Sequence, residues 1–421
     1  MKILYVSQYF SPETGAPAAR AAELAQYWVQ DGHEVTVLTG FPNHPNGIVL
    51  PNYRGMLRRP VMREEISGVK VVRTWLFPFP NRKAHERMLN YSSFCVSAAT
   101  TGMFLPRPDV LIATSPQLLV GLSGWWLARL KGAPFVFEVR DLWPESLVAV
   151  GMSNANSMLS RSLGSIAGFL YRRADHVVVV TPAFEDYLVR SWHVPAEKIS
   201  VVENGVNTDL FSPRLDNVLR SELAIDEKFV VSYIGTMGMA HGLDTLVEVA
   251  TELRQTAPEV LFLMVGEGAD KARIIQFAGS RRLSNMRFIN QQPREKVPEF
   301  ISASDVCLVP LKKTELFKTV VPTKMLEFMS CARPVILGVD GQARRILDLA
   351  AAGIFVEPQN ATALAQAIRK LATNPVLRET LGHNGRRYVV ENFSRQQTAK
   401  TYLTVLGKIL NKESRQTPAA A

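Results

Sequence analysis

The stretch FVVSYIGTMGMAHGLDTL, residues 229–246, joins an apolar β-type run to a helical pattern through a loop that carries three glycines. A buried parallel strand followed directly by a helix is the repeating unit of wound α/β sheets. Gly235, Gly238 and Gly242 surround the start of the helix, where backbone N–H groups can approach an anion closely. Tight helix–strand packing explains the same glycines equally well. The stretch therefore predicts an α/β domain and leaves a ligand site at its strand end open.

The same alternation of apolar strands and helical segments continues in both directions along the 421-residue chain. A chain of this length exceeds one ordinary core, so we expect two doubly wound, parallel-sheet, Rossmann-like domains, residues 1–208 and 209–392. The turn-rich NGVNTDLFSPRLDN, residues 204–217, lies at the boundary. An amphipathic helix is expected over 393–412 and a frayed tail over 413–421. The carboxyl ends of both sheets would then face a central cleft, where such sheets bind ligands.

The bulk composition indicates a folded protein, with 47% hydrophobic and 20% charged residues. The three cysteines form no CxxC pair, which suits a reducing compartment and suggests no metal ligation. MKILYVSQYF at the start lacks the small-residue cleavage site of a signal peptide. Residues 88–106 form the longest weakly charged stretch, but its many Ser and Thr residues disfavour a membrane span. These features predict a cytoplasmic protein.

The net charge of +10 is unevenly distributed along the chain. Between Arg54 and Arg87 stand nine Lys or Arg residues against three acids, beside the apolar stretch 88–106. This basic region could be a plain solvated face. Nucleic acid is disfavoured because no recognised binding module or interleaved aromatic pattern appears. An anionic membrane surface fits the adjoining basic and apolar residues better, with these candidate contacts: Arg58, Arg59, Arg82 and Lys83.

A second ligand-binding candidate lies in KTVVPTKMLEFMSCARPVI, residues 318–336. A helix is expected to begin near Thr323, acting as N-cap after Pro322. Lys324 and Glu327 then share the polar stripe of that helix. A lysine in the first turn opposes the helix dipole unless an anion binds there. The alternatives are therefore a surface ion pair between Lys324 and Glu327 and a site for a phosphorylated ligand.

Two further loops follow predicted strands. SPETGAPAAR, residues 11–20, places Gly15 before a helix but lacks the G-x-G-x-x-G fingerprint, which disfavours a nicotinamide-dependent dehydrogenase. VGEGAD, residues 265–270, holds Glu267 between two glycines. The chain contains no D-x-D triplet that would hold a divalent ion beside a diphosphate. We therefore expect no metal and no cofactor. The charge of a bound diphosphate would be neutralised by helix N-termini and basic side chains.

Three phrases, VVENGVNTDLFSP, ISASDVCLVP and PTKMLEFMSCARPVI, resemble segments of glycosyltransferase family 4, whose members have the GT-B fold. The resemblance runs over nearly the whole chain. It implies transfer of a sugar from a nucleotide diphosphate with retention at the anomeric carbon and without a bound metal. It also implies a donor site on the second domain, an acceptor site on the first, and a last helix that crosses back to the first domain.

The chain departs from this family at three positions. The family often carries two glutamates eight positions apart; Glu327 matches the second, which contacts the ribose, but Thr319 occupies the first. The family's diphosphate-binding Arg and Lys fall at Thr236 and His241. By hypothesis, Lys324 replaces them. The residues predicted to bind the donor are Gly15, Gly235, Gly238, His241, Glu267, Thr323, Lys324 and Glu327.

Two phrases in the first half, TGFPNHPNGIVLPNYRG at 39–55 and EVRDLWPES at 138–146, resemble transferases that build O-antigen and colanic-acid-type polymers. Some of these are described as N-acetyl-L-fucosaminyl transferases. Arg140 and Asp141 stand where many family members carry a His-Asp-like pair. Asp141 is the catalytic candidate, with helix N-capping as the alternative. The resemblance implies a UDP-sugar donor and a lipid-diphosphate-linked saccharide acceptor at the inner face of a bacterial plasma membrane.

Two other classes of protein fit part of this pattern. A nucleotide-sugar epimerase has a similar two-domain architecture and would interconvert a UDP-sugar without an acceptor. A non-catalytic nucleotide-sugar-binding protein of an assembly complex is favoured by the changed Thr236 and His241. The sequence leaves both alternatives open.

Overall fold

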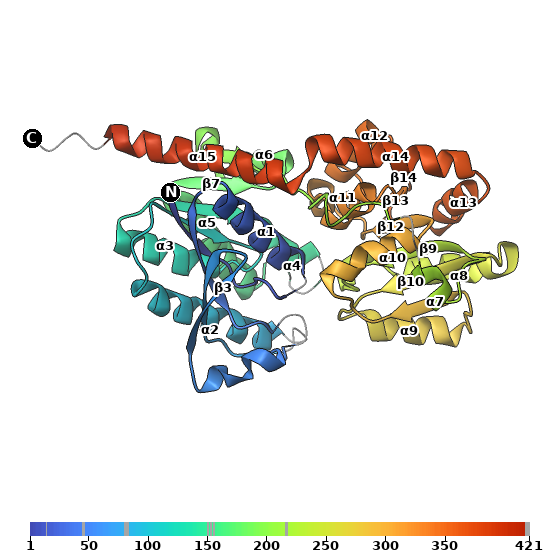
Figure 1. The fold of residues 1–421 in the computed structure, drawn as a ribbon, viewed down its shortest axis with the longest axis horizontal. Helices are drawn as coiled ribbons and strands as arrows, with labels where there is room; N and C mark the ends of the chain where they lie inside the picture. Colours follow the sequence, from blue (N-terminus) through green and yellow to red (C-terminus); the bar gives the residue numbers. More distant parts are fainter. Residues whose placement is uncertain are drawn as a thin grey trace, which may run out of the picture. The chain divides into compact units, whose positions relative to one another are not determined.

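The computed structural model describes residues 1–13, 15–43, 47–79, 84–149, 151, 154, 156–214 and 218–416. The chain forms two compact units (Figure 1). Unit 1 contains Met1–Asn204 and the chain from Arg395 onward, and unit 2 contains Gly205–Ser394. Each unit is built around its own sheet, which is typical of wound α/β domains.

The sheet of unit 1 has eight strands in the order β3-β4-β2-β1-β5-β6-β7-β8. The strands are β1 (Lys2–Val6), β2 (Glu34–Gly40), β3 (Val61–Ile66), β4 (Val69–Thr74), β5 (Val110–Thr114), β6 (Phe135–Val139), β7 (His176–Val179) and β8 (Ile199–Val201). All neighbours pair in parallel except β3, which is antiparallel to β4. β3 adds an antiparallel edge, within the basic region, to the parallel sheet that the sequence predicts. Ser67 and Gly68, both at positive φ, form its tight turn.

Helices cover both faces of this sheet. They are α1 (Ala16–Gln30), α2 (Ala84–Met103), α3 (Val120–Lys131), α4 (Glu145–Ala149), α5 (Met158–Arg173), α6 (Pro182–Trp192) and α15 (Arg395–Gln416), with the 3-10 turns η1 (Pro51–Leu57) and η2 (Ala196–Lys198). The last helix, α15, packs on α1, as the sequence predicts. Trp28 of α1 is fully buried there, and its Nε1 donates to the carbonyl oxygen of Ala399 at 3.2 Å. Arg395 and Glu23 form an ion pair of 2.7 Å at the same contact.

The sheet of unit 2 has six strands in the order β11-β10-β9-β12-β13-β14, and all neighbours pair in parallel. The strands are β9 (Phe229–Ile234), β10 (Val260–Val265), β11 (Met286–Ile289), β12 (Val306–Pro310), β13 (Val335–Gly338) and β14 (Gly353–Phe355). The helices are α7 (Val218–Glu222), α8 (Asp244–Thr256), α9 (Lys271–Ser280), α10 (Val297–Ala303), α11 (Thr323–Ser330), α12 (Gln342–Ala350), α13 (Ala361–Ala372) and α14 (Pro375–Asn392), with the 3-10 turns η3 (Met239–His241), η4 (Arg294–Lys296) and η5 (Leu316–Thr319).

The strand order of each sheet reverses once along the parallel strands, between β1 and β5 in unit 1 and between β9 and β12 in unit 2. Loops leave such a point toward opposite faces of the sheet, which opens a crevice at the carboxyl ends of the strands. The glycine-rich loop after β9 and the turns after β1 and β5 therefore occupy the positions where a wound sheet binds ligands.

Candidate functional site

Glycines allow the loops after β9 and β10 to lie against each other. Gly235 and Gly266 have φ angles of 137° and 145°, which favour glycine. A Cβ atom on Gly266 would collide with the carbonyl oxygen of Gly235. The N–H of Met237 donates to the carbonyl oxygen of Glu267 at 2.8 Å, which fixes the pair of loops further. Gly266 is thus required for loop packing and Gly235 for the backbone conformation of its own loop, whatever the loops bind.

The side chain of Lys324 ends at this loop. Its Nζ lies 4.0 Å from the centroid of the Tyr233 ring, and a Cβ on Gly235 would lie 2.8 Å from it. The Nζ atom is buried and has no hydrogen-bond partner among the described residues. Burial lowers the pKa of Lys324 to about 7, against a weaker opposing effect of Glu327. A buried amine without a partner is costly, and an anion at the loop would remove that cost.

His241 does not supply the charge of the basic pair that the family usually carries. Its ring lies 5.7 Å from that of Tyr233, and its Nδ1 is 3.4 Å from the carbonyl oxygen of Pro310. Burial, together with the charge of Lys324, lowers the pKa of His241 to about 3. The imidazole is therefore neutral near pH 7, whereas Lys324, with a pKa of about 7, is partly charged there.

Glu327 is engaged by Arg294 rather than by Lys324. The two side chains form an ion pair of 3.0 Å and are only 13% and 15% exposed. The Arg294 guanidinium also lies over the Phe211 ring, 4.8 Å from its centroid. The surface ion pair between Lys324 and Glu327, one of the two alternatives from the sequence, is not formed.

The predicted N-cap of α11 is wrong by one residue. Pro322 occupies the N-cap position and Thr323 is the first residue of the helix, without a side-chain capping bond. Thr323 cannot act as the N-cap, because it already lies within the helix. Thr323 remains next to Lys324 at the start of the helix.

Glu267, another predicted donor-binding residue, pairs with Lys271 at 2.6 Å, and the same Nζ donates to Asn290 at 2.7 Å. Gly238 precedes η3, and its carbonyl oxygen accepts from the His241 N–H at 3.1 Å. Gly15 is the N-cap of α1 with φ −70°, a conformation that any residue adopts. The structure thus brings Gly235, His241 and Lys324 together, while Gly15 belongs to unit 1.

Asp141 follows β6, which pairs with β5 one strand away from the reversal point of unit 1. The hydroxyl of Ser115, which follows β5, accepts from the N–H groups of Arg140 and Asp141 at 2.7 and 3.3 Å. Burial raises the pKa of Asp141 to about 6, although the charge of Arg140 opposes the rise. α4 begins four residues later at Glu145. No helix-capping bond to the Asp141 carboxylate is found among the described residues, so the capping alternative lacks support.

A buried ion pair lies next to Asp141 in the same unit, which sequence reasoning missed. Arg20 of α1 donates to Glu138 of β6 at 2.8 and 3.1 Å. The Tyr5 hydroxyl donates to the other Glu138 oxygen at 2.9 Å. Arg20 also donates at 3.1 Å to these acceptors: the carbonyl oxygens of Val202 and Glu203 and the side chain of Asn204. The network fixes α1 and β8 to the strand that carries Asp141.

The basic region is less uniform than its sequence suggests. Arg58 and Arg59 are exposed, whereas Arg82 and Lys83 lie outside the described residues. Arg73 is fully buried on β4, where it pairs with Glu64 and donates to the Gly40 carbonyl oxygen. Side chains alternate between the two faces of β4, the strand that pairs with β3, and this alternation could have indicated that Arg73 is buried. Arg73 is therefore part of the fold, not of a surface for a partner.

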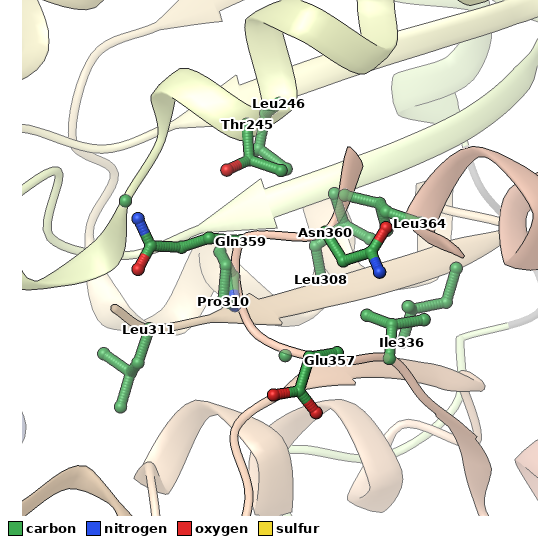
Figure 2. A pocket seen from close by; sticks show the side chains of 13 residues that line it. Thr245, Leu246, Leu308, Pro310, Leu311, Ile336, Glu357, Gln359, Asn360 and Leu364 are labelled. Carbon is green, nitrogen blue, oxygen red and sulfur yellow. The ribbon is translucent and has the colours of Figure 1, made fainter. Parts of the chain in front are cut away.

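Figure 2 shows a small cavity at the carboxyl ends of strands in unit 2, with Thr245, Gln359 and Pro310 among its walls. Its volume of about 20 Å³ is room for roughly one water molecule. Gln359 already accepts from the Lys313 N–H at 3.0 Å. The cavity is too small for a sugar, so Lys324 and the Gly235 loop remain the stronger candidate site.

Comparison with known proteins agrees with this architecture. Residues 15–205 match the family described as "Glycosyl transferase 4-like domain", and residues 216–388 match "Glycosyl transferases group 1". WcaI of Escherichia coli (strain K12), named as a glycosyl transferase of colanic acid biosynthesis, is 26% identical over 388 residues, covering 89% of this chain and 93% of that protein.

Solved structures share the fold. Sucrose-phosphate synthase from Thermosynechococcus elongatus has a TM-score of 0.78 at 22% identity, covering 97% of this chain and 99% of that one. Anabaena Alr3699/HepE in complex with UDP-glucose has a TM-score of 0.72 at 16% identity, covering 97% and 100%. With one family match in each unit and this fold, the chain belongs to the glycosyltransferases of GT-B type, pairing a glycosyl transferase 4-like unit with a group 1 unit.

Proposed function

We propose that the protein transfers a sugar from a nucleotide diphosphate, with retention and without a metal, to a lipid-diphosphate-linked saccharide. The observation that carries this proposal is the buried Lys324 amine, which has no hydrogen-bond partner among the described residues and ends at the Gly235 loop. A diphosphate supplies the missing anion. A UDP-sugar is the proposed donor, because HepE, which shares the fold, was solved with UDP-glucose.

The donor's diphosphate would lie at the start of α11, within reach of Lys324 and the N–H groups of the glycine loop. Departure of the nucleotide builds negative charge on that diphosphate. Hydrogen-bond donors that are already directed at this developing charge lower the activation barrier, since they need no reorganisation during the reaction. Thr323 offers a hydroxyl beside Lys324, and neutral His241 offers hydrogen bonding without adding charge.

Glu327 would accept hydrogen bonds from the ribose hydroxyls. Arg294 donates to its Oε1 at 3.0 Å and thereby orients the carboxylate. This role requires the second oxygen to face the nucleotide. Glu267, already paired with Lys271, would assist only by shaping the neighbouring loop.

Asp141 would act on the acceptor. A carboxyl group with a pKa of about 6 is mostly ionised at pH 7 and is a better proton acceptor than an ordinary aspartate. In a front-face mechanism the leaving phosphate takes the acceptor's proton itself, and Asp141 then positions the hydroxyl. No covalent intermediate is proposed. Arg140, whose buried Nε has no partner among the described residues, would meet an anionic acceptor.

We also propose that the protein works at the cytoplasmic face of a bacterial plasma membrane in surface-polysaccharide synthesis, since the similar WcaI is named for colanic acid biosynthesis. The sugar would be an N-acetylated deoxyhexosamine of the kind found in O-antigen and lipopolysaccharide. Arg58 and Arg59, with Arg82 and Lys83, would contact anionic lipid and the acceptor's diphosphate.

A donor panel tests the function. Purified protein is incubated with single nucleotide sugars and a bacterial membrane extract, and lipid-linked products are identified by mass spectrometry. One donor should extend one acceptor, and NMR should show the donor's anomeric configuration in the product. Conversion of a UDP-sugar without acceptor would establish an epimerase instead. Donor binding without turnover on any acceptor would establish the non-catalytic alternative.

A further inference from the structure

The exposed stripe of α2 carries no Lys, Arg, Asp or Glu at its described positions. Its exposed positions recur at helical spacing: His85, Leu89, Ser92, Val96, Thr100 and Met103, followed by Phe104 after the helix. Val96 is 65% exposed and Phe104 is 81% exposed. In a chain with 20% charged residues, a solvated helix normally shows its charges outward. A continuous uncharged stripe with large apolar side chains indicates a surface that meets a partner.

The end of α3 widens this stripe. A Cβ on Gly102 of α2 would collide with the Leu127 side chain of α3, so the two helices lie in direct contact. Lys131 Nζ donates to the carbonyl oxygens of Met103 and Leu105, at 3.2 and 2.5 Å. Next to this contact two large α3 side chains, Trp126 and Leu130, are 47% and 53% exposed. The apolar face is defined as Leu89, Val96, Met103, Phe104, Trp126 and Leu130.

A basic groove adjoins the apolar face. Arg129 stands between Trp126 and Leu130 in the sequence and lines a groove of about 1120 Å³ at the amino ends of β6, β7 and β8. The ionised side chains around the groove are mostly cationic: Arg129, Arg172, Arg173, Lys198 and Lys408, against Asp175 and Glu197. Arg172 and Arg173 are exposed. The groove therefore offers positive charge beside uncharged side chains.

We propose that the apolar face lies on an anionic lipid bilayer and that the basic groove receives its phosphate headgroups. Apolar side chains that enter the acyl boundary, with cations at headgroup level, are what an interfacial helix requires. No helix in the described parts of the chain is long and apolar enough to cross a membrane. An apolar helical stripe also suits a protein partner, but the adjoining cationic groove favours the phosphate headgroups of an anionic bilayer.

The role of this docking face depends on the proposed function, in which the acceptor is held in a lipid membrane. α2 follows β4 and so begins at the carboxyl edge of the sheet, then runs back toward the amino ends of the strands. Burial raises the pKa of Tyr91, in the first half of α2, and the nearby Asp141 carboxylate adds to that rise. The first half of α2 therefore lies near Asp141, and the end of α2 contacts α3, which contributes Arg129 to the basic groove. A lipid-anchored saccharide could reach Asp141 while its chains stay in the leaflet.

Co-sedimentation with vesicles tests the docking face without any sugar transfer. We expect binding to vesicles that contain phosphatidylglycerol, weak binding to phosphatidylcholine alone, and weaker binding in high salt. Val96→Asp and Phe104→Asp should each reduce the apparent affinity about tenfold or more. The matched controls Leu349→Asp and Met158→Asp, at positions 63% and 87% exposed, should bind like the wild type. Circular dichroism checks that each variant is folded.

The groove has a matched control of its own. Arg172→Gln with Arg173→Gln should weaken binding to anionic vesicles, whereas Arg344→Gln with Arg345→Gln, an adjacent exposed pair on α12, should not. The proposal is overturned if folded Val96→Asp and Phe104→Asp bind vesicles normally, or if the controls lose as much. It is also overturned if those variants dissociate a dimer in light scattering and the wild type binds no vesicles. Intact vesicle binding without sugar transfer would instead refute the proposed function alone.

Discussion

A buried cation lies near the strand ends of each unit, Arg20 in unit 1 and Lys324 in unit 2, and their surroundings differ. Arg20 donates to Glu138, to two backbone carbonyl oxygens and to Asn204. Lys324 Nζ has the Tyr233 ring 4.0 Å away and no hydrogen-bond partner in the described chain. A fully satisfied charge stabilises the fold. An unsatisfied one still has hydrogen bonds to donate.

The two carboxyl groups at the end of β6 differ in the same way. Burial disfavours ionised Glu138, but the charges of Arg20 and Arg140 outweigh it and hold its pKa below the usual value. At Asp141 the charge of Arg140 does not outweigh burial, which raises the pKa to about 6. The first carboxylate is committed to structure, and the second remains available for chemistry. The predictions below test this division.

The largest effect is expected for Arg20→Met. It leaves the buried Glu138 carboxylate without its cation, and breaking a buried pair from one side costs about 3–5 kcal/mol of unfolding free energy. Lys324→Met removes a buried charge that has no partner and should leave the unfolding free energy unchanged or higher. Denaturant unfolding of both variants measures this. Equal destabilisation would abolish the distinction between the two cations.

Asp141→Asn should lower the turnover number about a hundredfold, as loss of acid–base assistance typically does. Donor affinity should not change. The raised pKa of Asp141 means that its ionisation opposes folding as the pH rises from about 4 to 6 and above, so the amide should not lower the melting temperature at pH 7. A parallel fall in activity and melting temperature would assign Asp141 a structural role.

Lys324→Met should weaken nucleoside diphosphate binding by roughly tenfold to a hundredfold, because a hydrogen bond to a charged group contributes about 1.5–3 kcal/mol. Binding of the bare nucleoside, which has no phosphate, should hardly change. Lys324→Arg should restore part of the loss, since its guanidinium is longer and planar. Calorimetric titration gives all of these affinities, and equal losses for both ligands would remove Lys324 from the diphosphate site.

Glu327→Ala should weaken binding of both the nucleoside and the diphosphate by about tenfold, because the ribose is common to them. This pattern separates Glu327 from Lys324. The substitution also frees Arg294, so Glu327→Gln, which keeps the shape and loses the charge, serves as a second variant. Unchanged affinity in both folded variants would exclude the ribose contact.

The sequence predicted those features that depend on neighbouring residues. The strand, glycine loop and helix of residues 229–246 form as β9, the Gly235 loop and α8, because local periodicity and turn chemistry determine them. The final amphipathic helix was predictable for the same reason. Its burial against Trp28 follows from the apolar stripe that it needs to cover.

Charge pairing over long sequence distances was not predictable. Arg294 and Glu327 are 33 positions apart, and Arg20 and Glu138 are 118 apart. Only the tertiary fold decides which of several acids an arginine meets. Glu327 was therefore assigned to Lys324 as a possible partner from proximity along the helix. The actual partner, Arg294, comes from another segment, and this leaves Lys324 free for a ligand.

The smallest predicted effect is the pH dependence of diphosphate binding. With a pKa of about 7, Lys324 is half charged at pH 7 in the free protein, and only about one-tenth is charged at pH 8. The bound diphosphate favours the charged amine, so binding takes up a proton, and affinity should fall about fivefold between pH 7 and pH 8. His241, with a pKa of about 3, and the Tyr233 hydroxyl, whose pKa burial raises, do not titrate in this interval.

Two controls isolate Lys324. The second phosphate ionisation has a pKa of about 6, so the ligand is nearly fully charged throughout this interval. Lys324→Arg keeps its charge at every pH tested and should bind with an affinity that is independent of pH. Calorimetry in buffers of different ionisation enthalpy should detect proton uptake by the wild type and none by Lys324→Arg. The same pH dependence in both proteins would show that another group titrates, and the pH dependence would then give no support to Lys324 as the group that meets the diphosphate.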